Sequence, residues 1–376
     1  MADFKKLPFS KGELNTKLAD FFKDMLEKKT VDALLAPMVQ PKKGVMQTLV
    51  THPSHVEAID IFAPVVPVNA AKLASSLTSN PSGRKVAMVL RSCEIRALIE
   101  LVKLKQAHLE DVLLIGMDCL GRYENQDFFK FQEQGNTSED FIENALAGNT
   151  AFNDTDISAA CKICEFPVAD NVDLRLCIIA AGSGELLIES LTEKGEKALD
   201  SSDLSNAGAP KERQNAVQQL TEARINARDL LFKEHRETVN SIDALENEFA
   251  KCINCYNCRV ACPVCYCKEC VFVTDTFRHN GDQYMSWADS RGTLKMPADT
   301  IFFHLTRMAH IGLFCVGCGQ CSSACPNDIN LMPIFRTIAQ KTQDRFDYQA
   351  GRSVDEPQPL AVFHDDEFIE VTGQVK

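Results

Sequence analysis

The motif CINCYNCRVACP occupies residues 252–263, and CVGCGQCSSACP repeats its cysteine spacing at residues 315–326. Both copies follow the pattern C-x2-C-x2-C-x3-C-P, which is typical of proteins that hold two 4Fe–4S clusters. Three closely spaced thiolates reach three corners of one cubane while the short loop wraps around it. A zinc site usually takes two C-x2-C pairs, so two runs of four cysteines favour iron–sulfur clusters over zinc.

The fourth cysteine of each run is expected to bind the cluster of the other run, because the Cys-Pro step ends its loop on the far side of the core. The first predicted cluster therefore takes three ligands from the first run and one from the second: Cys252, Cys255, Cys258 and Cys325. The second takes the reverse combination: Cys315, Cys318, Cys321 and Cys262. A ferredoxin-like domain of α+β or α-helical class is expected around them.

Eight of the 16 cysteines lie outside these two motifs. Disulfides are disfavoured in a reducing compartment, so metal ligation and buried thiols are the competing interpretations. Three follow the first motif directly: Cys265, Cys267 and Cys270. Five lie upstream: Cys93, Cys119, Cys161, Cys164 and Cys177. We expect a third cluster on the C-x2-C pair at 161–164 and a fourth on the three downstream cysteines. Spacing leaves open which cysteines complete each.

The first 200 residues alternate between helical and strand patterns. Short apolar runs predict strands at 31–39, 44–50, 85–91, 112–118, 174–182 and 185–190. Helical spacing marks 14–29 and 94–106. The order strand, helix, strand over 85–118 predicts a parallel βαβ unit and hence an α/β domain. Cys93 and Cys119 each follow a predicted strand, at the end where open α/β sheets place their ligands.

The turn Ser92-Cys93-Glu94 opens a predicted helix whose N-terminus is suited to receive a flavin phosphate. Arg91 and Arg96 supply positive charge there, although surface ion pairing is the competing interpretation for both. No G-x-G-x-x-G motif follows a strand, so the sequence gives no support for a dinucleotide-binding Rossmann unit.

We expect four parts along the chain. They are an α/β domain at 1–200, a linker and bridging helix at 201–250, the ferredoxin-like domain at 251–345 and a polar tail at 346–376. An insert between the two cysteine motifs holds a predicted helix at 300–314 that carries His304 and His310. We expect both histidines to be packed or hydrogen-bonded rather than metal ligands.

The composition excludes several classes of protein. A net charge of −12 argues against nucleic acid as a partner and against a DNA-binding iron–sulfur sensor. The sequence holds no run of roughly 18 apolar residues, so no membrane span is expected. The N-terminal residues are too polar for a signal peptide, and a cytoplasmic location is the expectation.

Three segments resemble the beta subunits of methanogen formate dehydrogenases and of hydrogenases that reduce the deazaflavin coenzyme F420. These are CINCYNCRVACPVCYCKEC at 252–270, FFHLTRMAHIGLFCVGCGQCSSACPNDI at 302–329 and LRSCEIRALIELVKLKQAHLEDVLLIGMDCLG at 90–121. The CKIC segment at 161–164 also fits, and the resemblance is closest to the formate dehydrogenase subunit.

The resemblance implies a flavin-binding fold that holds FAD beside an iron–sulfur cluster and relays electrons between clusters and FAD. It implies a catalytic alpha subunit with a molybdenum or tungsten formate site or a nickel–iron site, or heterodisulfide-reductase-like partners. We therefore expect an iron–sulfur flavoprotein subunit of an anaerobic oxidoreductase complex. The alternative is a flavin-free adaptor with several clusters that connects two redox enzymes. The electron donor, the acceptor (deazaflavin or nicotinamide coenzyme) and the direction of flow are left open.

Overall fold

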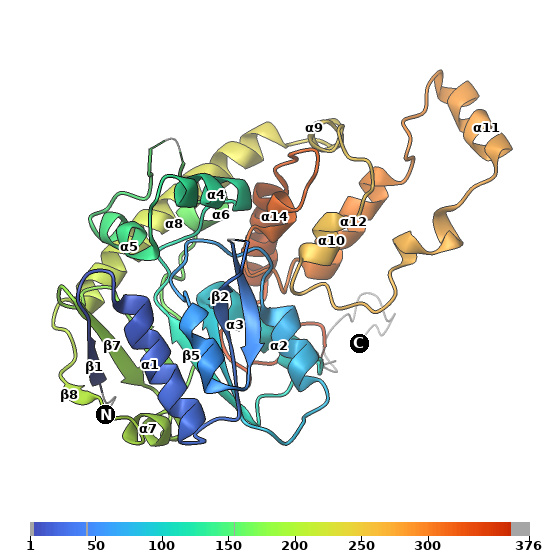
Figure 1. The fold of residues 1–376 in the computed structure, drawn as a ribbon. Coiled ribbons are helices and arrows are strands. Elements are labelled where there is room, and N and C mark those ends of the chain that lie inside the picture. The colour runs from blue at the N-terminus through green and yellow to red at the C-terminus, as the bar shows by residue number, and fades with distance from the viewer. Residues whose placement is uncertain (1–3, 43, 154, 362–376) are drawn as a thin grey trace, which may run out of the picture.

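The computed structural model describes residues 4–42, 44–153 and 155–361 (Figure 1). An eight-stranded sheet lies at its centre. In spatial order its strands are β3 (Val45–Val50), β2 (Ala33–Val39), β4 (Val86–Arg91), β5 (Val112–Met117), β6 (Leu174–Cys177), β7 (Glu185–Ser190), β1 (Phe4–Pro8) and β8 (Ser205–Ala207). The four strands β2, β4, β5 and β6 are parallel, and antiparallel strands flank them on both sides. The predicted α/β class is confirmed at this level.

The central strands are buried on both faces, which explains their nearly continuous apolar sequences. Along β4, Ala87 and Val89 join one hydrophobic core, while Met88 and Leu90 join a second core. This alternation follows from the two-residue period of side chains along a strand.

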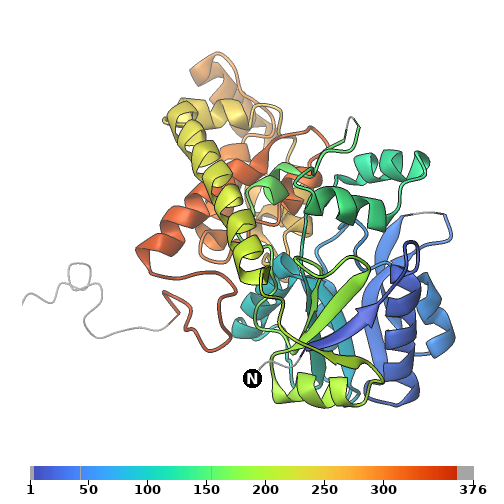
Figure 2. The same cartoon turned by 90° about the vertical axis from the view of Figure 1, so that its left-hand side faces the viewer.

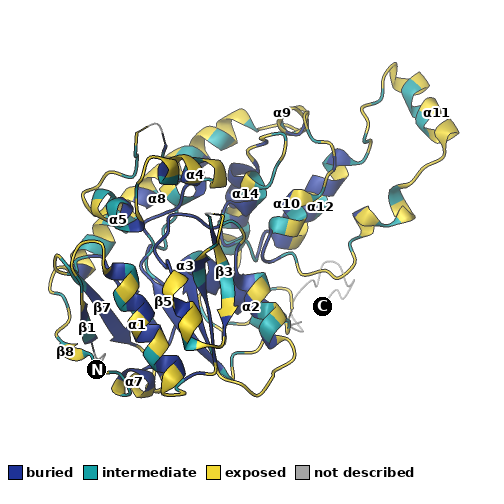
Figure 3. Ribbon diagram, viewed as in Figure 1, coloured by how far each residue is buried: buried dark blue, intermediate teal, exposed yellow. Residues whose placement is uncertain are grey.

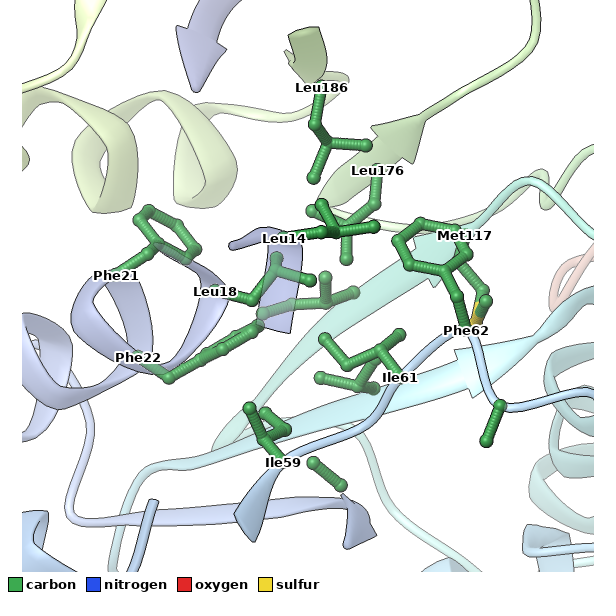
Figure 4. Close-up of a cluster of buried hydrophobic side chains, with 14 of the residues drawn as sticks. Leu14, Leu18, Phe21, Phe22, Ile59, Ile61, Phe62, Met117, Leu176 and Leu186 are labelled. Atoms are coloured by element: carbon green, nitrogen blue, oxygen red, sulfur yellow. The ribbon is translucent and has the colours of Figure 1, made fainter. Parts of the chain in front are cut away.

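The first core packs helix α1 (Leu14–Glu27) against the sheet (Figure 4). Leu14 and Leu18 of α1 lie at helical spacing and are almost fully buried against Met117 and Leu176 from the strands. The 3-10 helix η1 (Pro53–Ala58) leads into Ile59, which closes this core from the side.

The second core packs α2 (Ala71–Thr78) and α3 (Ser92–Lys103) on the opposite face of the sheet. It continues without a break into the C-terminal helices, because Cys258, Cys262 and Phe335 belong to the same buried cluster as Leu98 of α3. The cysteine motifs are thus attached to the sheet through α3.

The remaining helices form the connections and the C-terminal part. They are α4 (Asn125–Glu133), α5 (Ser138–Leu146), α6 (Ala159–Lys162), α7 (Glu193–Asp200), α8 (Arg213–Thr238), α9 (Ile242–Glu248), α10 (Asn257–Ala261), α11 (Gly281–Arg291), α12 (Thr300–Ile311), α13 (Gln320–Ser323) and α14 (Leu331–Arg345), with 3-10 turns η2 (Val271–Val273) and η3 (Asp275–Phe277). Helix α8 runs from the sheet toward the C-terminal helices (Figure 2). Helix α11 stands away from the body and is mostly exposed (Figure 3). Within the described ranges, no helix is long and apolar enough to cross a membrane.

Three local expectations differ from the structure. The helical pattern over 211–250 is broken at 239–241, because the side chain of Ser241 accepts a hydrogen bond from the Ala244 N–H and starts a new helix. Strand β8 lies inside the stretch expected to be a linker. The expected tail begins with buried residues: Gly351 donates its N–H to Glu100 at 2.6 Å, and Tyr348 is 5% exposed. The tail beyond residue 361 lies outside the described residues.

Candidate iron–sulfur sites

The two cysteine motifs fold into similar loops. Asn254 and Tyr256 flank the second cysteine of the first run with φ values of 53° and 61°. Gly317 and Gly319 occupy the equivalent positions of the second run with φ values of 73° and 74°. Left-handed residues at such positions turn backbone N–H groups inward and make an anion-binding concavity. Each loop is therefore shaped to surround a negatively charged group, and each leads into a short helix, α10 or α13.

The cysteines gather in the crossed combination expected from the motif. One cavity is lined by one thiol of the first run and three of the second, Cys262, Cys315, Cys318 and Cys321. In the other combination, Cys252 and Cys258 each lie within electrostatic reach of Cys255 and Cys325. Helices α10 and α13 pack together between these groups. We call the group of Cys252, Cys255, Cys258 and Cys325 set A and the group that lines the cavity set B.

Four upstream cysteines form a further group, set C. Strands β4 and β5 are parallel neighbours in which Arg91 pairs with Met117. Cys93 and Cys119 lie two residues beyond this pair, so both thiols emerge at the same edge of the sheet. Helix α6 and the turn after it bring Cys161 and Cys164 to this edge, and all four cysteines line one cavity.

Arginines surround set C. Arg91 donates from Nη1 to Cys119 Sγ at 3.4 Å. Arg224, from α8, donates to the backbone oxygens of Cys119 at 3.3 Å and Leu120 at 3.0 Å. Burial raises the pKa of the Cys93 thiol well above its ordinary value, so a neutral thiol is favoured unless a metal displaces the proton. The donors and the cavity fit a cluster bound through thiolates.

Sets B and C are adjacent in space. Cys318 lines the cavity of set C as well as that of set B. A Cβ atom added at Gly319 would lie 2.5 Å from Ala160 Cβ, so the loop of set B touches the helix that carries Cys161. Arg122 fixes this contact by donating to Ser323 Oγ at 2.7 Å.

The three sets are not preformed sites for a single ion. Among the residues that the structure describes, no three His, Cys, Asp or Glu side chains are arranged closely enough to hold one metal ion. A cubane spreads its ligand sulfurs over four iron atoms and needs a wider ring of thiols than zinc does.

Comparison with known proteins identifies relatives along almost the whole chain. The chain is 26% identical over 371 residues to the beta subunit of an F420-dependent formate dehydrogenase from Methanocaldococcus jannaschii, which covers 91% of this chain and 93% of the relative. The beta subunit of F420-dependent formate dehydrogenase 1 from Methanococcus maripaludis is 26% identical over 388 residues. This second alignment covers 94% of each of the two chains. The chain is similar to these beta subunits over nearly its whole length.

Two other comparisons are less informative. No protein-family model matches this chain. Among solved structures, one chain of the F420-reducing [NiFe] hydrogenase complex from Methanosarcina barkeri aligns at 11% identity and a TM-score of 0.47. The alignment covers 65% of the present chain and 94% of the hydrogenase chain.

The turn expected to bind a flavin phosphate is engaged with the protein itself. Glu94 accepts the N–H groups of Arg91 at 2.8 Å and Ala70 at 2.9 Å, which caps α3. Ser92 is buried and lines the cavity of set C. Arg96 points elsewhere, stacks on the Phe166 ring at 3.5 Å and lines a separate cavity of about 490 Å³. A cofactor role for the turn stays a prediction.

The remaining four cysteines have different surroundings. Cys177 is fully buried in the sheet, and its charged neighbours are Asp118, Arg213, Glu189 and Arg175 rather than cysteines. Cys265 lies within electrostatic reach of Cys262 and Cys267, whereas Cys267 is exposed and Cys270 is partly buried beside the second core. The structure does not bring Cys177 to any of the three sets, and the fourth cluster stays a prediction.

Sequence reasoning missed the buried arginines around the sets. Arg122, Arg224, Arg307 and Arg336 all have exposed fractions below 9%. No spacing pattern marks any of them in the sequence. His304 is hydrogen-bonded, as expected, with Nε2 3.3 Å from Cys252 Sγ. His310 is exposed, so the same expectation is wrong for it.

A buried ion pair anchors α8 beneath set C. Asp118, directly before Cys119, accepts from Arg213 Nη1 at 2.6 Å and Nη2 at 2.7 Å, and its Oδ2 also accepts from the Ile178 and Ile179 N–H groups. We expect Arg213→Met to lower the free energy of unfolding by about 3–5 kcal/mol, because it leaves a buried carboxylate without its cation. Denaturant unfolding measures this. Arg236→Met, at an exposed position of the same helix, is the control, and an equal loss there would contradict the expectation.

Proposed function

We propose that the chain is the iron–sulfur flavoprotein subunit of an oxidoreductase complex, with three 4Fe–4S sites arranged as one path. The observation that carries this proposal is that Cys318 lines two cavities at once, those of sets B and C. Each of the two cysteine motifs supplies ligands to both set A and set B, so these two sets are also adjacent. Electrons could therefore pass from set A through set B to set C within this one chain. When bound, such clusters pass single electrons, and FAD exchanges electrons singly or in pairs.

Residues of this chain would bind the clusters and exclude water from them. Thiolates of sets A, B and C are the ligands, and the left-handed turns direct backbone N–H groups toward the sulfurs. Phe303 and Phe335 exclude water around sets A and B, while Arg91 supports set C. No side chain needs to act as a general acid or base. We keep the division into an α/β domain up to about residue 200 and a ferredoxin-like domain at 251–345 as part of the proposal.

For FAD we propose the cavity of about 490 Å³, which is within the usual size range of ligand pockets. It lies between α8, α14 and the chain that follows α14, and Cys315 of set B lines it. Arg96, Arg228 and Arg336 also line it, and guanidinium groups are suited to bind phosphate. In this structure Arg228 and Arg336 both pair with Glu165 of the same lining. The rings of Phe166 and Tyr348 complete the lining.

The partner follows from the relatives, which are named as subunits of F420-dependent formate dehydrogenases. We propose that a catalytic alpha subunit, of the molybdenum or tungsten formate dehydrogenase type or the nickel–iron hydrogenase type, delivers or receives the electrons. Heterodisulfide-reductase-like subunits are the further candidate partners.

Flavin content tests the proposal against the flavin-free adaptor. We expect about one FAD per chain after anaerobic purification, and a lower content in Arg228→Ala because a phosphate ligand is removed. Arg236→Ala, on the same helix but outside the cavity, is expected to keep the flavin. Iron-loaded protein without flavin would favour the adaptor. Full flavin in Arg228→Ala would argue against the cavity as its site.

A further inference from the structure

Arg307 is a buried cation with no acidic partner in the described part of the chain. It lies on α12, in the insert between the two cysteine motifs, and is 4% exposed. None of the carboxylates that the structure describes forms a salt bridge with it. Its Nε atom is buried without a hydrogen-bond partner. An uncompensated buried charge costs several kcal/mol, so another negative group must stabilise it.

The groups around Arg307 are sulfurs from both ferredoxin-type sets. Nη1 donates to Cys258 Sγ at 3.1 Å, and Nη2 donates to the Cys258 backbone oxygen at 3.2 Å. Cys262 and Cys321, which belong to set B, lie within electrostatic reach of the same guanidinium. Arg307 also lines the cavity of set B. The Arg307 guanidinium therefore interacts with thiols of both set A and set B.

Aromatic packing fixes the position of this charge. The guanidinium carbon lies 4.5 Å from the ring centroid of Phe335 and 5.6 Å from that of Phe303. One turn earlier on α12, His304 contacts set A through Cys252. Its ring is stacked on Phe249, with centroids 3.8 Å apart. Helix α12 thus presents an imidazole to set A and a permanent cation between the two sets.

We propose that Arg307 is the shared counter-cation of sets A and B and raises the reduction potentials of both clusters. The proposal rests on the proposed function, since it needs a cluster at each set. Reduction adds one electron and one negative charge to a cluster, and a fixed positive charge within reach favours the reduced form. Because the guanidinium stays protonated over the physiological range, its effect is independent of pH.

The test is an EPR-monitored redox titration of the full chain, purified anaerobically and assayed first for iron. Arg307→Gln is expected to shift the reduction equilibria of both clusters about tenfold or more toward the oxidised form. For a one-electron step, tenfold corresponds to about 59 mV lower midpoint potential. Arg307→Lys keeps the charge and is expected to keep most of the potential. Arg291→Gln removes an exposed arginine of α11 and is expected to change neither signal.

Unchanged potentials in an iron-replete Arg307→Gln protein would overturn the proposal, and so would a shift in only one cluster. If Arg307→Gln loses iron, Arg307→Lys decides: retention of both clusters supports the role of the charge, and equal loss overturns it. Wild-type protein that binds no cubane iron would instead refute the proposed function, so the two failures are distinguishable.

Discussion

Replacing Cys325 with alanine is expected to remove the same cluster as replacing Cys252, although the two cysteines belong to different motifs. Both thiols lie in set A, where Cys252 and Cys258 are within electrostatic reach of Cys325. Each variant is expected to lose about four iron atoms per chain and the same EPR signal of the reduced protein. Iron analysis and EPR spectra of the dithionite-reduced proteins measure this.

The matched pair for that experiment comes from set B. Cys262→Ala is expected to give the spectrum of Cys321→Ala, because both thiols line the same cavity. If Cys325→Ala instead matched Cys321→Ala, and Cys262→Ala matched Cys252→Ala, each motif would hold its own cluster. That outcome would contradict the crossed assignment.

The second large effect is expected at set C. Cys119→Ala is expected to remove about four iron atoms while sets A and B keep theirs. Cys119 contributes a thiol at the sheet edge, where Arg91 and Arg224 hold its side chain and backbone. Iron and sulfide analysis, together with the EPR signals that remain, measures the loss.

Cys177→Ala is the control for set C, since Cys177 is also an upstream cysteine but is fully buried inside the sheet, away from the other thiols. It is expected to keep all of the iron. Loss of a cluster in Cys177→Ala, or full retention in Cys119→Ala, would show that a different group of upstream cysteines binds the metal.

Much of the site follows from local sequence patterns. The crossed sets follow from the motif itself, and the meeting of Cys93 with Cys119 follows from two neighbouring parallel strands that end in register. The position of Cys161 and Cys164 cannot be predicted from local patterns. Only tertiary packing brings the long connection through α4 and α5 back to the sheet edge. Cys177 sits at the end of strand β6 and so resembles Cys93 and Cys119 in sequence, but its side chain is enclosed by the sheet.

The charged groups and the first strand could be placed only with three-dimensional information. Arg224 and Arg307 are surrounded in sequence by ordinary helical residues, and only packing brings them to the cysteines. Strand β1 reads as a polar segment because it contains Lys5 and Lys6, yet it pairs with β7, where Lys6 forms an ion pair with Glu185. The break between α8 and α9 depends on a single capping serine.

The most direct test of the central claim, three adjoining cluster sites in one chain, is the iron and acid-labile sulfide content of the anaerobically purified protein. Three occupied sets predict at least about twelve iron and twelve sulfide per chain. A content of about eight or fewer in fully reconstituted protein would contradict the third site and, with it, the continuous path through Cys318.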